Sequence, residues 1–448
     1  MDSRLKYQVH TFGCKVNTYD TGLIQKNLNH AGFQWVQADP ETKVHVLNTC
    51  AVTAEATKEA VKYIRRLKAK NPFCKVVVTG CAAQVDTGAF ENLPGADLVV
   101  ANSHKGQIPD LIDKLYKGEL QQKVFKSNIF KKDDLEMGGG EEKSHTRSFL
   151  KIQDGCNSFC TYCIIPYARG KSRSIPMAEI ARRINDLYAQ GVREVVLTGV
   201  HVGDYEDEVL GQKKGLEDLV EYVLNKTKMP RFRLASLEPV EVTERLLDLY
   251  VANSRLCPHF HMSIQSANTK VLHDMKRKYT KEDVQKALRA IEERLPHAYI
   301  GMDVIVGFPT ETLEDFEDTF LTLADLPWTR IHVFPYSERQ GTRAAVMTET
   351  VPPAERSQRA ARLRELSARR HQEKAQAQIG TIKDVLVLKS AAKGGQGLSH
   401  DYWPVDLVGV EESFLEAWAG QEIKVKIQGY EHNNPMHFEG HLKGELLL

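Results

Sequence analysis

The sequence predicts an α/β protein with an N-terminal doubly wound parallel-sheet domain, a central partial (β/α)6 barrel and a small all-β barrel at the C-terminus. The first two parts are predicted by the same pattern, which occurs twice. Short β-rich runs alternate with amphipathic helical stretches over residues 1–120 and again over 147–378. A third observation is the change to short strands and turns over residues 379–448. Residues 121–146 are charged and contain three consecutive glycines, which favours a linker.

Composition limits the class of protein. The chain has 448 residues, enough for two or three domains with sizeable cores, and 42% hydrophobic and 27% charged residues are typical of a soluble globular protein. It has no apolar run of membrane-spanning length, and its N-terminus lacks the apolar core of a signal peptide. We therefore expect a cytosolic protein with reduced thiols, in which clustered cysteines more often bind metal than form disulfides. The net charge of +1 predicts no global basic field for nucleic acid.

The N-terminal domain is expected to contain four strands and at least two helices. The expected strands are 5–14, 43–50, 75–81 and 97–103, with helices over 19–32 and 53–71. Cys14, Cys50 and Cys81 each end one of the first three strands. Ligands of parallel sheets lie beyond the carboxyl ends of the strands, so these thiols are expected to converge on one rim. Cys74 lies roughly 23 Å from Cys81 at strand rise and is left out of this site. The alternative is that the three are buried core thiols, since free cysteine packs well.

The central domain is expected to contain six strand–helix units. The strands are expected over 148–155, 193–200, 231–236, 259–265, 301–309 and 330–337. Helices are expected over 176–191, 215–226 and 312–326, and an arginine-rich helix over 354–378. The active site of such a barrel belongs at the carboxyl ends of its strands.

A stretch with three cysteines, "DGCNSFCTYCIIPYARG", follows the first barrel strand. Cys156, Cys160 and Cys163 have C-x3-C-x2-C spacing and no obvious fourth ligand, because the next cysteine downstream is Cys257. Structural zinc sites use four ligands, whereas a 4Fe–4S cluster held by three thiolates leaves one iron open for a small molecule. The alternative is three unrelated thiols in one loop. The lone Cys257 is most simply a buried apolar residue.

This loop and its place after the first strand resemble the radical SAM superfamily. The resemblance implies that the open iron is chelated by the amino and carboxylate groups of S-adenosylmethionine (SAM), and that an electron from the cluster cleaves SAM to a 5′-deoxyadenosyl radical. Read in order, further motifs resemble the methylthiotransferase family over nearly the whole chain. They are "FGCKVNTYDT", "NTCAVT", "VTGCAAQ", "LTGVHVGDY", "LASLEP", "HMSIQSANTKVLHDMKRKYT", "DVIVGFPTET" and "FPYSERQGTRA".

The family resemblance implies two 4Fe–4S clusters. Cys14, Cys50 and Cys81 would hold an auxiliary cluster that supplies or carries the inserted sulfur, and the C-terminal barrel would be a TRAM domain that binds RNA. The family reaction uses two SAM molecules, one to methylate a sulfur and one to generate the radical. It also needs an electron donor such as flavodoxin or ferredoxin, and a sulfur source.

The first motif favours one substrate branch of this family. Lys15, Val16 and Asn17 are similar to the branch that acts on N6-threonylcarbamoyladenosine beside the anticodon of tRNA, and "TGVHVGDY" favours the same branch. The branch acting on isopentenyladenosine usually has Gln-Met-Asn at this position, and the branch acting on a ribosomal protein has Pro-Lys-Asn. A hypothesis of a different class is a non-catalytic RNA-binding protein that keeps one cluster for stability. Six intact ligand cysteines argue against it.

Polar residues end two of the barrel strands. The resemblance implies that SAM binds a layer formed by Ser236, Glu238, Ser263, Gln265 and Ser266, although ordinary turn hydrogen bonding is the alternative. His201 is a further candidate for this site, or a structural histidine. Candidate phosphate contacts are Arg169, Arg173, Arg277 and Lys278. Candidate RNA contacts in the terminal barrel are Tyr402, Trp403, Lys424 and Lys426, of which either aromatic residue could instead be core. The arginines of helix 354–378 either contact RNA or simply solvate a packed helix.

Overall fold

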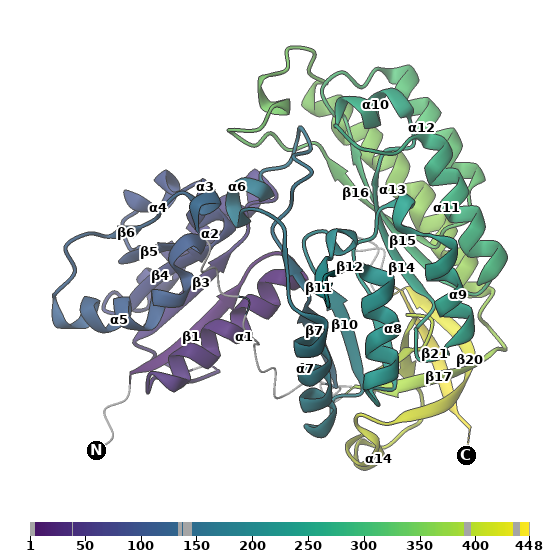
Figure 1. Ribbon diagram of the computed structural model, residues 1–448, viewed down its shortest axis with the longest axis horizontal. Coiled ribbons are helices and arrows are strands. Elements are labelled where there is room, and N and C mark those ends of the chain that lie inside the picture. Colours follow the sequence, from purple (N-terminus) through teal and green to yellow (C-terminus); the bar gives the residue numbers. More distant parts are fainter. Residues whose placement is uncertain are drawn as a thin grey trace. The chain divides into compact units, whose positions relative to one another are not determined.

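The computed structural model describes residues 5–37, 39–132, 137, 146–388, 396–432 and 440–447. Its contacts divide the chain into two compact units, which are described separately below (Figure 1). The first unit contains residues 1–142, 149–174 and 337–346, and the second contains 143–148, 175–336 and 347–448. Both cysteine groups singled out from the sequence therefore belong to the first unit.

The first unit is built on a parallel six-stranded sheet with the order β2–β1–β3–β4–β5–β6. Its strands are β1 (Lys6–Thr11), β2 (Gln34–Trp35), β3 (Val44–Thr49), β4 (Lys75–Gly80), β5 (Leu98–Ala101) and β6 (Val124–Phe125). The four expected strands are present, and two short edge strands are added. One of these, β6, lies in the segment expected to be a linker, whose residues 133–136 and 138–145 are outside the described part of the chain.

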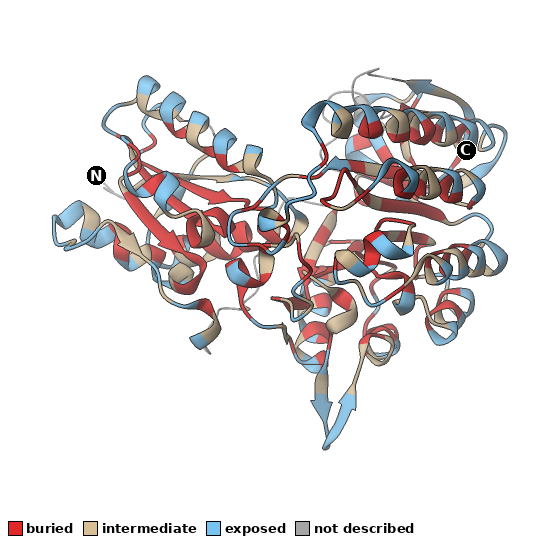
Figure 2. Ribbon diagram, turned by 90° about the horizontal axis from the view of Figure 1, so that it is seen from above, coloured by how far each residue is buried: buried red, intermediate tan, exposed pale blue. Residues whose placement is uncertain are grey.

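Helices cover both faces of this sheet because the strand residues alternate in direction. The helices of the unit are α1 (Lys15–His30), α2 (Ala54–Lys70), α3 (Cys81–Val85), α4 (Gly88–Glu91), α5 (Ile108–Lys117) and α6 (Ile165–Arg169), with 3₁₀ turns η1 (Asn102–Gln107) and η2 (Ile129–Lys131). Val77 packs with α1 and α5, whereas Val76 and Val78 pack with α2 and α4 on the opposite face. The sheet is therefore buried between two helical layers, as the red strands in Figure 2 show.

The second unit contains most of the expected barrel. Its parallel strands form two runs, β7–β10–β13 and β14–β15–β16, joined by an isolated bridge between Leu237 and Met262. The strands are β7 (Arg147–Lys151), which continues into the first unit, β10 (Glu194–Thr198), β13 (Arg231–Leu234), β14 (His259–Gln265), β15 (Tyr299–Val306) and β16 (Arg330–Pro335). The six strands match the six that the sequence predicts.

Helices line the outside of these strands (Figure 1). They are α7 (Met177–Ala189), α8 (Leu216–Lys226), α9 (Glu244–Ala252), α10 (Thr269–Asp274), α11 (Lys281–Arg294), α12 (Leu313–Asp325) and α13 (Pro353–Gln376), with 3₁₀ turns η3 (Val202–Asp204) and η4 (Pro239–Glu241). A short hairpin, β11 (Asp207–Val209) and β12 (Gln212–Lys214), follows η3. The remaining short elements of the chain are β8 (Gln153–Asp154), β9 (Arg173–Ser174) and η5 (Ala344–Val346), all in the first unit.

The arginines of α13 hold this helix on the barrel. Arg359 is buried against the Glu311 carboxylate at 2.5 Å, and Arg370 donates to the carbonyls of Leu326 and Ala324, each at 2.7 Å. The interpretation as a packed, solvated helix is therefore the right one for these side chains. Among the described residues, no helix is long and apolar enough to span a bilayer.

A closed five-stranded barrel completes the second unit, with strands in the order β17–β18–β19–β21–β20. They are β17 (Ile382–Val387), β18 (Gln396–Ser399), β19 (Pro404–Leu407), β20 (Glu422–His432) and β21 (Gly440–Leu446), with one helix, α14 (Glu412–Trp418). Two buried arginines attach this barrel to β13: Arg231 and Arg233 each donate to the Ser399 carbonyl, at 2.9 and 3.0 Å. The predicted fold class is confirmed.

Candidate cluster and cofactor sites

Adjacent strands of the first unit bring the N-terminal cysteines to one rim. Cys14 caps α1 just after β1, Cys50 directly follows β3, and Cys81 begins α3 directly after β4. The three strands are neighbours, and their carboxyl ends are in register, since Thr11 pairs with Asn48 and the next residue, Thr49, pairs with Gly80. The predicted convergence of strand ends is therefore present in the sheet. Cys74, at the other end of β4, is fully buried.

The thiols at this rim lie in a shared electrostatic environment. Burial raises the pKa of Cys50 to about 12, and the neighbouring Cys81 and Cys14 raise it further. Burial also raises the pKa of Cys81, while the Arg169 guanidinium opposes that shift. Thiols held close together in a buried site favour binding of a cation, which replaces their protons. The chemistry of this donor set fits an iron–sulfur cluster.

Gly13 makes room for this arrangement. Its φ of +96° favours glycine, and a Cβ atom there would lie 2.6 Å from the Cys50 Cβ and 2.7 Å from its sulfur. The Phe-Gly-Cys sequence therefore has a steric role in bringing Cys14 beside Cys50.

The second cysteine group lies on a loop closed by a two-stranded ribbon. In β8 and β9, Asp154 pairs with Arg173, and the Cys156 amide donates to the Gly170 carbonyl at 3.2 Å. Inside this frame, the Cys163 amide donates to the Cys160 carbonyl at 3.0 Å. The donor set is three thiols from one short loop, which fits a cluster with three protein ligands.

A buried charge network lies beside both cysteine groups, and sequence reasoning missed it. Arg169, expected to face phosphate, is 3% exposed and pairs with Asp154 at 3.0 Å and Asp20 at 3.1 Å. Lys151 bridges the same two carboxylates, at 2.9 and 2.7 Å. Burial lowers the pKa of Arg169, but the neighbouring Cys81 sulfur and the Asp154 and Asp20 carboxylates outweigh burial and hold it well above its ordinary value. The expectation that Arg169 contacts phosphate is wrong. The only sequence signal was the position of Asp154 and Arg169 at the two ends of the cysteine loop.

In the second unit, the residues proposed to contact SAM lie at the carboxyl ends of β13 and β14. Ser236 and Gln265 have φ of 57° and 63°, a conformation that costs energy for such residues and clusters at functional sites. Ser263 is half-buried within β14, and its carbonyl accepts from the Tyr279 hydroxyl at 2.9 Å. Ser266 is buried and its hydroxyl lies 3.1 Å from that of Thr319, which favours a structural role.

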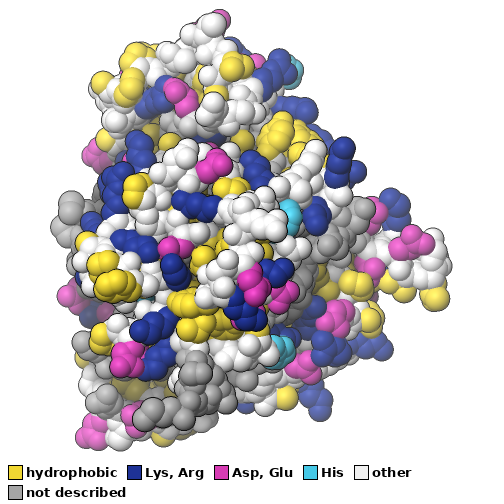
Figure 3. Space-filling model, turned by 90° about the vertical axis from the view of Figure 1, so that its left-hand side faces the viewer, with side chains coloured by type: hydrophobic (Ala, Val, Ile, Leu, Met, Phe, Trp, Pro, Cys, Tyr) yellow, Lys and Arg dark blue, Asp and Glu magenta, His cyan; other side chains and the backbone are white. Residues whose placement is uncertain are grey.

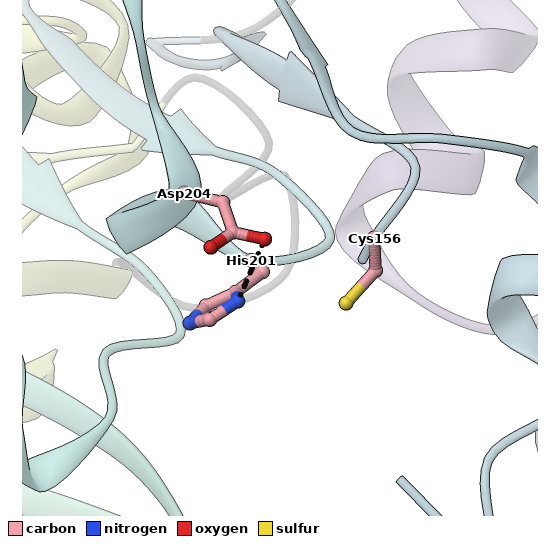
Figure 4. A group of neighbouring side chains, drawn as sticks. All are labelled: Cys156, His201 and Asp204. Carbon is pink, nitrogen blue, oxygen red and sulfur yellow. Dashed lines mark ion pairs between the residues drawn. The ribbon is translucent and has the colours of Figure 1, made fainter. Parts of the chain in front are cut away.

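Glu238 is the charged centre of this layer. Arg277 lies 3.0 Å from its carboxylate, and His201 Nε2 lies 3.3 Å from it. Burial raises the pKa of Glu238, and Arg277 and His201 oppose the shift. His201 Nε2 also lies 2.6 Å from Glu241. Its Nδ1 pairs with Asp204 at 3.2 Å, and Figure 4 draws this ion pair as a dashed line. Arg277 is thus a partner of Glu238, which the sequence did not reveal, whereas Lys278 is exposed.

Two aromatic residues expected to contact RNA have other partners. Trp403 is 3% exposed in the core of the terminal barrel, so its prediction as an RNA contact is wrong and the core alternative is right. Tyr402 stacks on His259 with 3.7 Å between ring centroids, and the Arg233 guanidinium lies 5.0 Å from its ring. Lys424 and Lys426 are exposed on β20. On the face drawn in Figure 3, lysine and arginine side chains are scattered among acidic and apolar ones.

Comparison with known proteins identifies the class. Residues 150–323 match the radical SAM superfamily, and residues 6–101 match the uncharacterized protein family UPF0004. A radical S-adenosylmethionine methyltransferase, TsrM from Kitasatospora setae, solved with cobalamin and a [4Fe-4S] cluster bound, has a similar fold. The TM-score is 0.56 at 16% identity, over 77% of each chain. The fold and the cysteine loop are therefore those of a radical SAM protein.

Relatives narrow this class to a family. The chain is 36% identical over 372 residues to a threonylcarbamoyladenosine tRNA methylthiotransferase of Aquifex aeolicus, covering 82% of this chain and 89% of that protein. It is 33% identical over 393 residues to a tRNA-2-methylthio-N(6)-dimethylallyladenosine synthase of Wolbachia pipientis, covering 86% and 88%. The chain belongs to the radical SAM methylthiotransferase family.

Proposed function

We propose that this protein is a transferase that inserts a methylthio group at C2 of N6-threonylcarbamoyladenosine next to the anticodon of tRNA. The observation that carries the proposal is the pair of three-cysteine groups, one at adjacent strand ends and one on a closed loop. The substrate branch rests on Lys15, Val16 and Asn17 and on the name of the relative with 36% identity. The product is 2-methylthio-N6-threonylcarbamoyladenosine.

The cofactors of this reaction are two 4Fe–4S clusters and SAM. Cys156, Cys160 and Cys163 would hold the cluster that binds SAM, and the N-terminal group of Cys14, Cys50 and Cys81 would hold the auxiliary cluster. When bound, these groups supply a radical able to activate an unreactive C–H bond, and the sulfur to be inserted. The protein's own contribution is to hold three thiols at adjacent strand ends and three in one loop.

Ser236, Glu238, Ser263 and Gln265 are proposed to bind SAM. The support for this role is the strained backbone of Ser236 and Gln265 and the buried carboxylate of Glu238. Because Arg277 and His201 oppose the effect of burial on the Glu238 pKa, they favour the ionised form, which accepts hydrogen bonds from hydroxyl or ammonium groups.

The reaction also requires partners. We propose that the anticodon stem-loop of tRNA is bound with help from the terminal barrel as a TRAM domain. We further propose that an electron donor such as flavodoxin or ferredoxin and a separate sulfur source serve the enzyme, and that it works in the cytoplasm. Lys424 and Lys426 remain candidates for phosphate contact because both are exposed on one strand.

A second candidate substrate is isopentenyladenosine, favoured by the 33% identity to a dimethylallyladenosine synthase over 86% of the chain. Mass spectrometry of total-tRNA nucleosides from a gene-deletion strain and its parent separates the two. Loss of 2-methylthio-N6-threonylcarbamoyladenosine, with accumulation of its unthiolated precursor, is the expected result. Selective loss of the isopentenyl product would transfer the proposal to the other branch, and an unchanged profile would contradict both.

Purified variants test the division of labour between the cysteine groups. Cys156→Ala should abolish reductive SAM cleavage, whereas Cys50→Ala should allow SAM cleavage but form no methylthio product. Cys74→Ala is the matched control, because Cys74 is a buried cysteine of the same sheet at the opposite end of β4. Methylthio product from the Cys50→Ala variant would refute the auxiliary site.

A further inference from the structure

Arg169 occupies an unusual position between the two cysteine groups. It ends α6, in the same loop as Cys156, Cys160 and Cys163, yet its side chain points away from solvent and is 3% exposed. One terminal nitrogen, Nη1, donates to Asp154 at 3.0 Å. The other, Nη2, donates to the Asn17 side-chain oxygen at 2.6 Å and to Asp20 at 3.1 Å. Asn17 and Asp20 both belong to α1, the helix that Cys14 caps.

Asn17 transmits this contact to the N-terminal rim. Its amide nitrogen donates to the Phe12 carbonyl at 2.7 Å and to the Thr49 carbonyl at 3.1 Å, two residues before Cys14 and one before Cys50. Because Arg169 can only donate, the Asn17 oxygen must face it, and this fixes the amide nitrogen toward the two carbonyls. The same oxygen lies 4.0 Å from the Cys81 sulfur. The Asn17 side-chain oxygen therefore has both the Arg169 guanidinium and the Cys81 thiol as neighbours.

The charges around Arg169 do not balance. Four cations face two buried carboxylates, Asp20 and Asp154. Arg169 and Lys151 are buried, whereas Lys105 and Arg173 are partly exposed. Lys105 is 2.9 Å from Asp20, so it belongs to the same network. Positive charge is therefore in excess around the buried Arg169 side chain, where charges act over longer distances than in water.

We propose that Arg169 is the residue that positions the N-terminal cysteine rim and raises the reduction potential of the auxiliary cluster held there. The inference rests on the proposed function, which assigns a 4Fe–4S cluster to Cys14, Cys50 and Cys81. Reduction of such a cluster adds one electron and one negative charge and breaks no bond. A fixed guanidinium next to Cys81 stabilises the more negative, reduced form, and so makes the cluster easier to reduce.

The test uses full-length protein in which Cys156, Cys160 and Cys163 are all alanine, so that only the auxiliary cluster is observed. Iron and sulfide content and the midpoint potential, from a dithionite titration followed by electron paramagnetic resonance, are the readouts. Three variants are compared in this background. Arg169→Gln removes the charge, Arg169→Lys keeps it, and Arg173→Gln is the matched control. Arg173 pairs with the same Asp154 at 3.1 Å but is 25% exposed.

The expected result is a midpoint potential that is more negative in Arg169→Gln than in the parent. It should be nearly unchanged in Arg169→Lys and less shifted in Arg173→Gln. An unchanged potential in Arg169→Gln with full iron content would overturn the proposal, and so would an equal shift in Arg173→Gln. If Arg169→Gln fails to bind iron, the midpoint potential of Arg169→Lys tests the proposal instead. A cluster with near-parent potential in that variant supports the proposal, and a lost or equally shifted cluster overturns it. If the parent background itself shows no cluster signal, the cluster assignment under the proposed function fails rather than the role of Arg169.

Discussion

Replacing Glu194 with glutamine tests how the terminal barrel is attached to β13. Glu194 is fully buried at the start of β10, and its carboxylate accepts from Arg147 at 2.5 Å, Arg233 at 2.9 Å and Arg231 at 2.9 Å. Burial alone would raise the Glu194 pKa, but the three guanidinium groups, Arg233 first, hold it well below its ordinary value. The carboxylate is therefore ionised and is the counterion of two arginines that are each 1% exposed.

The burial of Glu194 sets the free energy that the Glu194→Gln substitution should cost. Glutamine keeps the size of the side chain but removes its charge, and turns one acceptor into a donor that faces a guanidinium. Removing one partner of a buried ion pair costs about 3–5 kcal/mol. Arg231 and Arg233 keep their hydrogen bonds to the Ser399 carbonyl. We therefore expect a destabilisation near the lower end of this range, about 3 kcal/mol. The loss of stability should extend to β18, which contains Ser399.

Hydrogen–deuterium exchange measures the stability of individual segments. A local measurement is needed because a two-cluster protein with several domains does not unfold in a single reversible step. Peptides covering β10, β13 and β18 should exchange faster in Glu194→Gln, with an opening free energy lower by about 3 kcal/mol. Glu179→Gln is the matched control, because Glu179 also pairs with two arginines, Arg182 and Arg183, but on an exposed helix surface. It should cost about 0–1 kcal/mol. A change below about 1 kcal/mol in Glu194→Gln would refute the reasoning.

Three further predictions concern the first unit. Gly13→Ala should remove iron from the N-terminal site, as measured in protein lacking the second cysteine group, because the new Cβ would lie 2.6 Å from that of Cys50; full iron content would show that the rim can adjust. Burial is the main reason that the pKa values of His10 and His45 are lowered to about 4 in the folded protein. The unfolded chain therefore binds protons at a higher pH than the folded protein does. The stability of metal-free protein should consequently fall as the pH is lowered from about 6.5 to about 4. The opening free energy of peptides covering β1 and β3, measured by hydrogen–deuterium exchange, should fall over that window by up to about 1.4 kcal/mol per pH unit for each histidine and stay level above it. His45→Asn should reduce this pH dependence. Cys74→Ala should keep the parent's iron and sulfide content, and a loss of four irons would place Cys74 among the ligands.

The order of elements could be predicted from the sequence because local patterns determine it. Alternation of β-rich and amphipathic runs gave the doubly wound sheet, the six barrel strands and the terminal barrel, and the strand-end positions of Cys14, Cys50 and Cys81 followed from the rule for parallel sheets. The two-residue edge strands β2 and β6 were not predictable, because pairing with a neighbour defines them and their own sequence carries no period. The second cysteine group could also be predicted, because Cys156, Cys160 and Cys163 lie in one short loop and their spacing is visible in the sequence.

The partners of the charged and aromatic side chains were decided only by the tertiary structure. Arg169, Arg277 and Trp403 each read as possible RNA contacts in the sequence, yet they are buried against Asp154, Glu238 and the barrel core respectively. A charge or a ring has the same appearance in sequence whether it faces solvent or a partner distant in the chain, because burial depends on which strands become neighbours. The sequence by itself determined which cysteines are candidate ligands, and that three of them follow the ends of parallel strands. The tertiary structure decided which cations lie beside those ligands, since Arg169 meets Asn17 only after two segments about 150 residues apart have packed together.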